Sequence, residues 1–356
     1  MTSGIIRPKH WYGLVLIALL VLVIGSVRSV TAQTPKPSPT PTATPQEPEI
    51  DPDDVISVNT SEVLLPVTVR DASGRLVDGL RREDFKIFED GVQQSLSDIS
   101  LRQVPVDVVL MIDASSSAVE NLDDFRRAAE GFASHLGADD RISLIQFDDR
   151  VLLLQDWTQS LLQFRRALKR IVPGRFTRFH DAVLLAGKDQ KARSSARHAI
   201  IVLSDGIDNA DGATFQAALR GALHSQTAIY VISNTAIERA EKQRELTNLM
   251  GGSLASAKFN QLHIEDLQMG LAALNASERN LQELATTTGG RLYKPNSFQD
   301  LESVYAEVAN ELSHQYGLYY SPLNKRRDGQ FRRVKVETLS PDYKATSRIG
   351  YYAPAR

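Results

Sequence analysis

Hard oxygen ligands occur in three separate polar segments of this sequence. The pattern Asp-x-Ser-x-Ser follows the apolar run 106–112, a threonine lies in the segment 174–181, and an aspartate follows the apolar run 199–203. Carboxylate and hydroxyl oxygens suit Mg²⁺ or another hard cation, and the chain has no cysteine that could supply a soft ligand. The residues concerned are Asp113, Ser115, Ser117, Thr177 and Asp205.

Apolar periodicity predicts that these segments are loops of an α/β sheet. The almost continuous apolar run 106–112 and the mainly apolar segments 142–147, 199–203 and 228–232 are typical of parallel strands that are covered on both faces. Segments with helical spacing separate them, and this alternation indicates a doubly wound, mostly parallel sheet with helices on both faces. Ligands of such sheets bind beyond the carboxyl ends of the strands, where the strand order reverses. The polar segments after 106–112 and 199–203 are therefore expected at that edge.

Two flanks of β character enclose the α/β domain, which we place at 105–314. Apolar residues alternate from Val63 to Val69 in the flank 55–104 and again from Tyr316 in the flank 315–356, where Asp328-Gly329 predicts a hairpin turn. Neither flank has enough strands for a core of its own, so we expect the two to pair into one small β-sandwich. Two loose β extensions of the α/β domain are the alternative.

The segment 235–277 interrupts the alternation of strands and helices. It contains possible helices at 238–249 and 264–274, separated by Gly251-Gly252, and a further helix is expected at 281–287. Long excursions from compact domains are usually functional or disordered. We therefore treat 235–277 as an insertion whose role the sequence does not define.

The N-terminus has the features of an export signal. Basic residues precede an apolar run from Trp11 to Val27, and small residues end at Ala32, so residues 1–32 are expected to be a cleaved signal peptide. The run also comes near the lower limit of about 17–25 residues for a spanning helix, so a membrane anchor is the alternative. The Pro- and Thr-rich segment 33–54 is expected to be a linker. In either case the protein is exported to the periplasm, the cell surface or the medium.

From about Val106 to Leu312 the sequence resembles a von Willebrand factor A-type domain, and the β flanks resemble those of an exported bacterial subgroup. The oxygen ligands match, in order and context, the metal ion-dependent adhesion site of that family. The resemblance implies hydroxyl ligation by Ser115, Ser117 and Thr177, and ligation by Asp113 and Asp205 directly or through water. The chain departs from the family where Arg175 and Phe176 stand in place of glycines before the threonine.

The resemblance implies a binding protein rather than an enzyme. A divalent cation, most simply Mg²⁺ with Mn²⁺ or Ca²⁺ as alternatives, would coordinate an Asp or Glu carboxylate of a protein partner. Arg175 and Arg178 beside the cation would steer acidic partners towards it. Two alternatives remain, a structural role in which the metal only fixes loops and a metal-dependent hydrolase. The formal net charge of −2 argues against nucleic acid, and membrane association is expected only through the N-terminal segment.

Overall fold

The computed structural model describes residues 62–355 apart from 102–103, 116–120, 192–195 and 252–258. The expected signal peptide at 1–32 and linker at 33–54 lie outside the described residues. Within the described part of the chain, no helix combines the length and the apolar character that crossing a membrane requires. The described residues belong to one compact unit.

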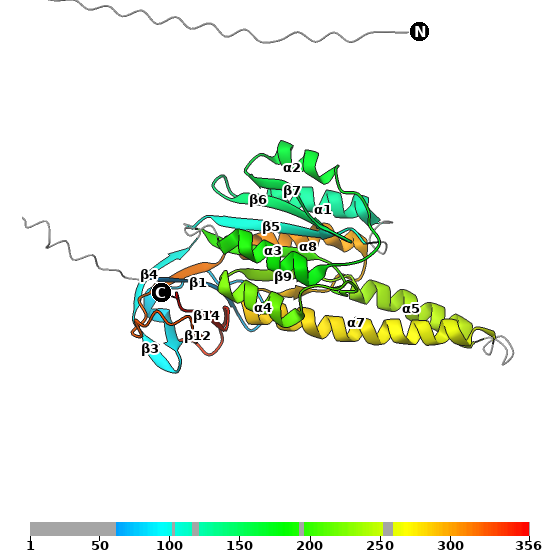
Figure 1. Ribbon diagram of the computed structural model, residues 1–356. Helices are drawn as coiled ribbons and strands as arrows, with labels where there is room; N and C mark the ends of the chain where they lie inside the picture. The colour runs from blue at the N-terminus through cyan, green and yellow to red at the C-terminus, as the bar shows by residue number, and fades with distance from the viewer. Residues whose placement is uncertain (1–61, 102–103, 116–120, 192–195, 252–258, 356) are drawn as a thin grey trace, which may run out of the picture. The chain divides into compact units, whose positions relative to one another are not determined.

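A six-stranded sheet forms the centre of this unit (Figure 1). The strand order is β10-β9-β8-β5-β6-β7, and all neighbours are parallel except β6 and β7. Every residue of β5 is buried, as the continuous apolar run predicts for a central strand. The strands are β5 (Val106–Asp113), β6 (Arg141–Phe147), β7 (Val151–Thr158), β8 (Arg197–Leu203), β9 (Ala228–Ile232) and β10 (Leu292–Tyr293).

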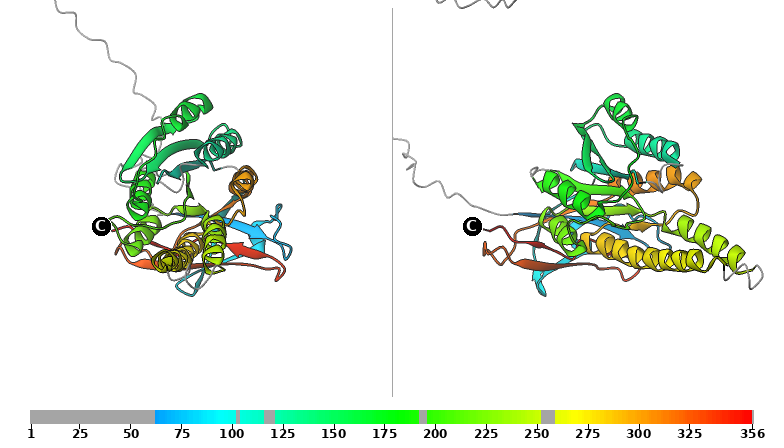
Figure 2. Two further views of the ribbon diagram at one scale, coloured as in Figure 1. Left: turned by 90° about the vertical axis from the view of Figure 1, so that its right-hand side faces the viewer. Right: turned by 45° about the vertical axis from the view of Figure 1, so that its right-hand side comes forward.

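Helices cover both faces of this sheet (Figure 2). Alternate residues of β5 point to opposite faces, so Val108 and Leu110 pack with α1, α2 and α8, whereas Val109 and Met111 pack with α3, α4 and α7. This arrangement confirms the predicted doubly wound fold. The helices are α1 (Leu122–Ser134), α2 (Leu161–Leu168), α3 (Phe179–Lys191), α4 (Phe215–His224), α7 (Gln261–Thr288) and α8 (Leu301–Ser313).

The two flanks form two antiparallel sheets with strand orders β13-β1-β11-β4 and β14-β12-β2-β3. Both sheets mix strands from the two flanks, and their inner faces share one apolar core, so the predicted sandwich is confirmed. The strands from the first flank are β1 (Val63–Arg70), β2 (Phe85–Glu89), β3 (Val92–Gln94) and β4 (Leu96–Leu101). Those from the second are β11 (Tyr316–Tyr320), β12 (Phe331–Thr338), β13 (Lys344–Thr346) and β14 (Gly350–Tyr352).

The prediction of a β-hairpin at Asp328-Gly329 is wrong. Gly329 has the positive φ of 68° that such a turn requires, but β11 and β12 on either side belong to different sheets. β11 pairs with β1 and β4, whereas β12 pairs with β2 and β14. Long-range pairing with the first flank therefore separates the strands on either side of Gly329.

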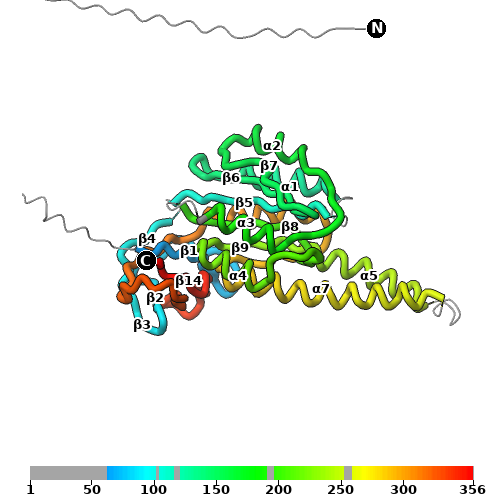
Figure 3. Tube along the Cα trace, viewed as in Figure 1, coloured from blue at the N-terminus to red at the C-terminus, as the bar shows by residue number. Residues whose placement is uncertain are grey.

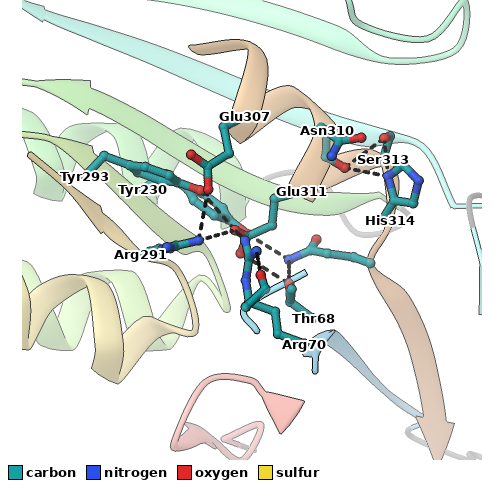
Figure 4. A network of polar contacts seen from close by, with 12 residues as sticks. Thr68, Arg70, Tyr230, Arg291, Tyr293, Glu307, Asn310, Glu311, Ser313 and His314 are labelled. Carbon is teal, nitrogen blue, oxygen red and sulfur yellow. Dashed lines mark hydrogen bonds and ion pairs between the residues drawn. The ribbon is translucent and has the colours of Figure 1, made fainter. Parts of the chain in front are cut away.

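A buried carboxylate, Glu311 of α8, connects the sandwich to the α/β domain (Figure 4). It accepts hydrogen bonds from Thr68 Oγ1 at 3.3 Å and Tyr293 Oη at 2.9 Å, and it forms an ion pair with Arg70. Thr68 and Arg70 belong to β1, and Tyr293 belongs to β10. One side chain with 2% exposure therefore holds three elements from distant parts of the sequence.

The insertion at 235–277 forms most of a helical arm, which consists of α5 (Thr235–Met250) and α7. The two helices pack against each other and run past the central sheet from the edge where α5 follows β9 (Figures 1 and 3). The helices expected at 264–274 and 281–287 are one continuous helix of 28 residues. The second half of α7 packs on the sheet through Leu281 and Leu284, whereas its first half and α5 project beyond the sheet.

Candidate metal centre

Three neighbouring strands end in register at the edge where the predicted ligands lie. Ile112 of β5 pairs with Leu203 of β8, and Leu203 pairs with Ile232 of β9. Asp113 therefore leaves the sheet beside Asp205, which comes two residues after Leu203. The chain passes from β5 to β6 on one side and later returns to β8 on the other, so this is the point where the strand order reverses.

Asp113 is 4% exposed, and both of its carboxylate oxygens accept hydrogen bonds. Oδ1 accepts from the backbone N–H of Ser115 at 2.9 Å, and Oδ2 accepts from Ser204 Oγ at 2.6 Å. The Ser115 side chain also hydrogen-bonds this carboxyl group. The end of β5 is thus joined to the end of β8 through side chains, and the carboxylate is held in one orientation.

Asp205 and the following glycine form a tight turn against α7. Oδ1 of Asp205 accepts from the backbone N–H of Ile207 at 2.8 Å, and its backbone carbonyl accepts from Ser277 Oγ. Gly206 has a φ of +70°, and a Cβ there would lie 2.6 Å from Leu281 Cδ2 and 2.7 Å from Ser277 Oγ. Only glycine combines this backbone conformation with such a close approach of the helix.

The loop that carries Thr177 is fastened to both neighbours. Gly174 N–H donates to the carbonyl of Ala114 at 2.8 Å. Thr177 N–H donates to Asn209 Oδ1 at 2.8 Å, and Asn209 N–H donates back to the Thr177 carbonyl at 3.2 Å. Thr177 is 5% exposed. The loops of Asp113, Thr177 and Asp205 therefore form one hydrogen-bonded group, which includes Ser115. The predicted ligand Ser117 lies outside the described residues.

Residues 108–207 match the model of the von Willebrand factor type A domain. This segment of the chain is similar to von Willebrand factor type A domains. No curated protein matches the sequence. Similar solved structures include a von Willebrand factor type A protein from Catenulispora acidiphila (10% identity, 83% of this chain, 75% of that chain, TM-score 0.43). Also similar is an aerotolerance-related membrane protein from Bacteroides fragilis (16% identity, 58% of this chain, 99% of that chain, TM-score 0.40). A third is the vWF domain of the pilus tip protein Mfa5 from Porphyromonas gingivalis (15% identity, 59% of this chain, 95% of that chain, TM-score 0.42).

Burial leaves the two aspartates of the site, Asp113 and Asp205, poorly solvated. It raises the pKa of Asp113 above its ordinary value and that of Asp205 well above it, in the latter case with repulsion from Glu238 and Asp113. Among the described residues, no three His, Cys, Asp or Glu side chains group closely enough to hold a metal by themselves. The aspartates with the hydroxyls of Ser115 and Thr177 form a donor set that fits a hard divalent cation, whose charge would offset that of both carboxylates.

The two arginines of the threonine loop lie in different environments. Arg178 is held in place, because its guanidinium bonds the carbonyls of Asp149 and Asp211 and forms an ion pair with Asp181 at 3.0 Å. Arg175 is exposed. The steering role expected for these arginines stays a prediction, and Arg178 has a structural task in addition.

Sequence reasoning missed several residues that shape this candidate site. Ser204 positions Asp113 from the neighbouring strand, and Asn209 fixes the threonine loop. Both lie in the polar segment after the run 199–203, which the sequence showed, but their partners depend on which strands are neighbours. At the end of β9, Asn234 and Glu238 also lie close to the site, and the polar residues that follow the run 228–232 were the available sign.

Proposed function

We propose that this chain is an exported, non-catalytic protein that binds a protein partner through a divalent cation. The observation that carries the proposal is the hydrogen-bonded group of three loops, which brings two buried aspartates and a buried threonine to one edge of the sheet. The metal ion-dependent adhesion site of von Willebrand factor type A domains binds divalent cations, and its sequence pattern is present here. Export follows from the N-terminal segment and stays part of the proposal.

The chemistry of the site supports binding of an acidic group. Two carboxylates balance the charge of a divalent cation, and the neutral hydroxyls add oxygen ligands without adding charge. The cation, when bound, would supply a positive centre with positions left for a partner's Asp or Glu carboxylate. The chain's own residues orient the site, since Ser204 fixes Asp113 and Asn209 fixes the backbone of Thr177. We propose Mg²⁺ as the cation and an acidic protein surface as the partner.

The histidine nearest the site supports a non-catalytic role. Nδ1 of His180 lies 3.0 Å from Asp208 Oδ2, and its backbone N–H donates to the same oxygen. The ring also packs edge-on against Phe179 and Phe215. These contacts connect α3 to the loop after β8, so His180 has a structural task at the start of its helix. A purely structural metal that fixes the loops is the second candidate function.

Calorimetry with Mg²⁺ and Mn²⁺ on the purified protein tests the metal site. We expect one bound ion, and Asp113→Ala and Thr177→Ala should weaken binding at least tenfold because each removes an oxygen ligand. Asp139→Ala is the matched control, since this exposed aspartate precedes β6 at the far end of the sheet. Unchanged affinity in Asp113→Ala, with the fold intact, would contradict the assignment. N-terminal sequencing of the mature protein tests export, and Gln33 as first residue is the expected result.

A further inference from the structure

The in-register row of strand ends continues to β9, which sequence analysis did not connect with the site. Ile232 pairs with Leu203, and Ser204 N–H donates to the carbonyl of Ile232 at 3.2 Å. Asn234 therefore lies as far beyond β9 as Asp205 lies beyond β8. Neighbouring strands are about 4.8 Å apart, so the first turn of α5 begins beside the loop of Asp205.

Asn234 carries an unsatisfied oxygen at this position. The residue is 6% exposed, and its Nδ2 donates to Glu238 Oε1 at 2.7 Å. Its Oδ1 is buried and accepts no hydrogen bond from any described residue, although Asn234 stands at the N-cap of α5, where such an oxygen usually accepts from the helix. A buried acceptor without a donor costs about 1–3 kcal/mol. Since no described residue supplies the donor, a ligand of the site is one source for it.

Glu238 follows one helical turn later and adds negative charge beside the two aspartates. Its carboxylate interacts repulsively with Asp205 and with Asp113. The start of α5 is held rigidly, because Thr235 and Arg239 both donate to Glu278 of α7, which Lys294 also contacts at 2.9 Å. These contacts fix the first turn of α5, and the hydrogen bond from Asn234 Nδ2 holds the Glu238 carboxylate.

We propose that Asn234 and Glu238 form a fourth loop of the metal site and act on the bound cation through its water ligands. This inference rests on the proposed function. The three acidic side chains do not form a group that could hold an ion directly, so a water on the cation is the donor that suits Asn234 Oδ1 and the Glu238 carboxylate. The root of the arm is then part of the site.

The test is calorimetric titration of the full chain with Mn²⁺. Outer partners of metal ligands change affinity about 10–100-fold, so Glu238→Gln and Asn234→Ala should each weaken binding about tenfold. Glu245→Gln is the matched control, because this exposed glutamate on α5 undergoes the same charge change. Its affinity should stay within about twofold of the wild type, since solvent screens an exposed charge. Wild-type affinity in Glu238→Gln, or an equal loss in Glu245→Gln, would overturn the inference.

Thermal unfolding without metal separates this role from a structural one. If Glu238 serves the cation, its removal relieves repulsion, and the metal-free variant should unfold at the same temperature as the wild type or at a higher one. A lower unfolding temperature without metal, together with a weaker affinity, would mean a structural residue and would overturn the inference. Asp113→Ala distinguishes the two proposals. If the Asp113→Ala variant binds Mn²⁺ like the wild type, the proposed function is wrong. If Asp113→Ala weakens binding but Glu238→Gln does not, only the proposal of a fourth loop is wrong.

Discussion

The hydroxyl of Ser277 in α7 donates a hydrogen bond to the backbone carbonyl of Asp205 in the loop after β8. This bond joins the long helix of the arm to the turn that presents one of the two buried aspartates. Gly206 lets the contact form, because no Cβ separates the turn from the helix. The position of Asp205 therefore depends on the packing of α7 as well as on the strand that precedes it.

Gly206→Ala should lower both the stability and the metal affinity of the protein. The substitution strains a residue with φ of +70° and places a methyl group against Ser277 and Leu281, so we expect a loss of about 2–4 kcal/mol. Gly74→Ala is the matched control, since Gly74 has φ of +83° but a Cβ there would meet no other atom within 4 Å. It should cost about 1–2 kcal/mol and leave metal binding unchanged. Urea unfolding and calorimetry measure both effects, and equal losses would contradict the packing argument.

The carboxylate of Glu278 should stabilise the arm in a pH-dependent way. Hydrogen bonds from Arg239, and then the contacts with Lys294, lower its pKa from 4.5 to about 2. A lowered pKa in the folded state stabilises the fold above pH 4.5, and this contribution is lost as the pH falls towards 2. Glu278→Gln should cost about 1 kcal/mol at pH 7 in urea unfolding and progressively less below pH 4.5. Glu283→Gln, an exposed neighbour on α7, should show no such trend.

Glu311 should be among the most sensitive positions in the interface between the sandwich and the α/β domain. Glu311→Gln removes the charge that Arg70 pairs with and weakens the bond from Tyr293, so we expect a loss of about 3 kcal/mol in chemical unfolding. Glu307→Gln is the control one turn earlier. Its carboxylate is 47% exposed and pairs with Arg291 at 3.1 Å, so the change should cost less than about 1 kcal/mol. A similar loss of unfolding free energy in both variants would contradict the claim that the buried carboxylate stabilises the fold more than the exposed one.

Removing Arg178 should lower the free energy of unfolding more than removing Arg175, the other arginine of the threonine loop. Arg178→Ala removes two hydrogen bonds to carbonyls and an ion pair, so it should destabilise the protein by about 1–2 kcal/mol. Arg175→Ala should change stability by less than about 0.5 kcal/mol, because the side chain is exposed. Urea unfolding measures both. If charge near the site steers partners, both variants should slow association with an acidic protein at low salt.

The strands were predictable because their apolar patterns are local. All eight residues of β5 are buried, and β1 alternates as its sequence does. The continuity of α7 was not predictable, because its first half leaves Leu262 and Met269 exposed at 78% and 63% and so shows no stripe that faces a core. At the site, residue types pointed to Asp113 and Asp205 as candidate ligands, and this assignment stays a prediction. Ser204 and Asn234 could not be assigned, since their roles depend on which strands lie side by side.

The interleaving of the two flanks has a consequence for the order of folding. Val63 opens β1, yet it pairs with Tyr320, and β1 also pairs with β13 near the end of the chain. The α/β domain has all of its strands once β10 is synthesised, whereas β1 must wait with both edges unpaired for strands that are made last. Such distant pairings form slowly, and an unpaired apolar strand invites aggregation. Until the sandwich assembles, β1 is therefore the part of this chain that is most exposed to aggregation with other chains.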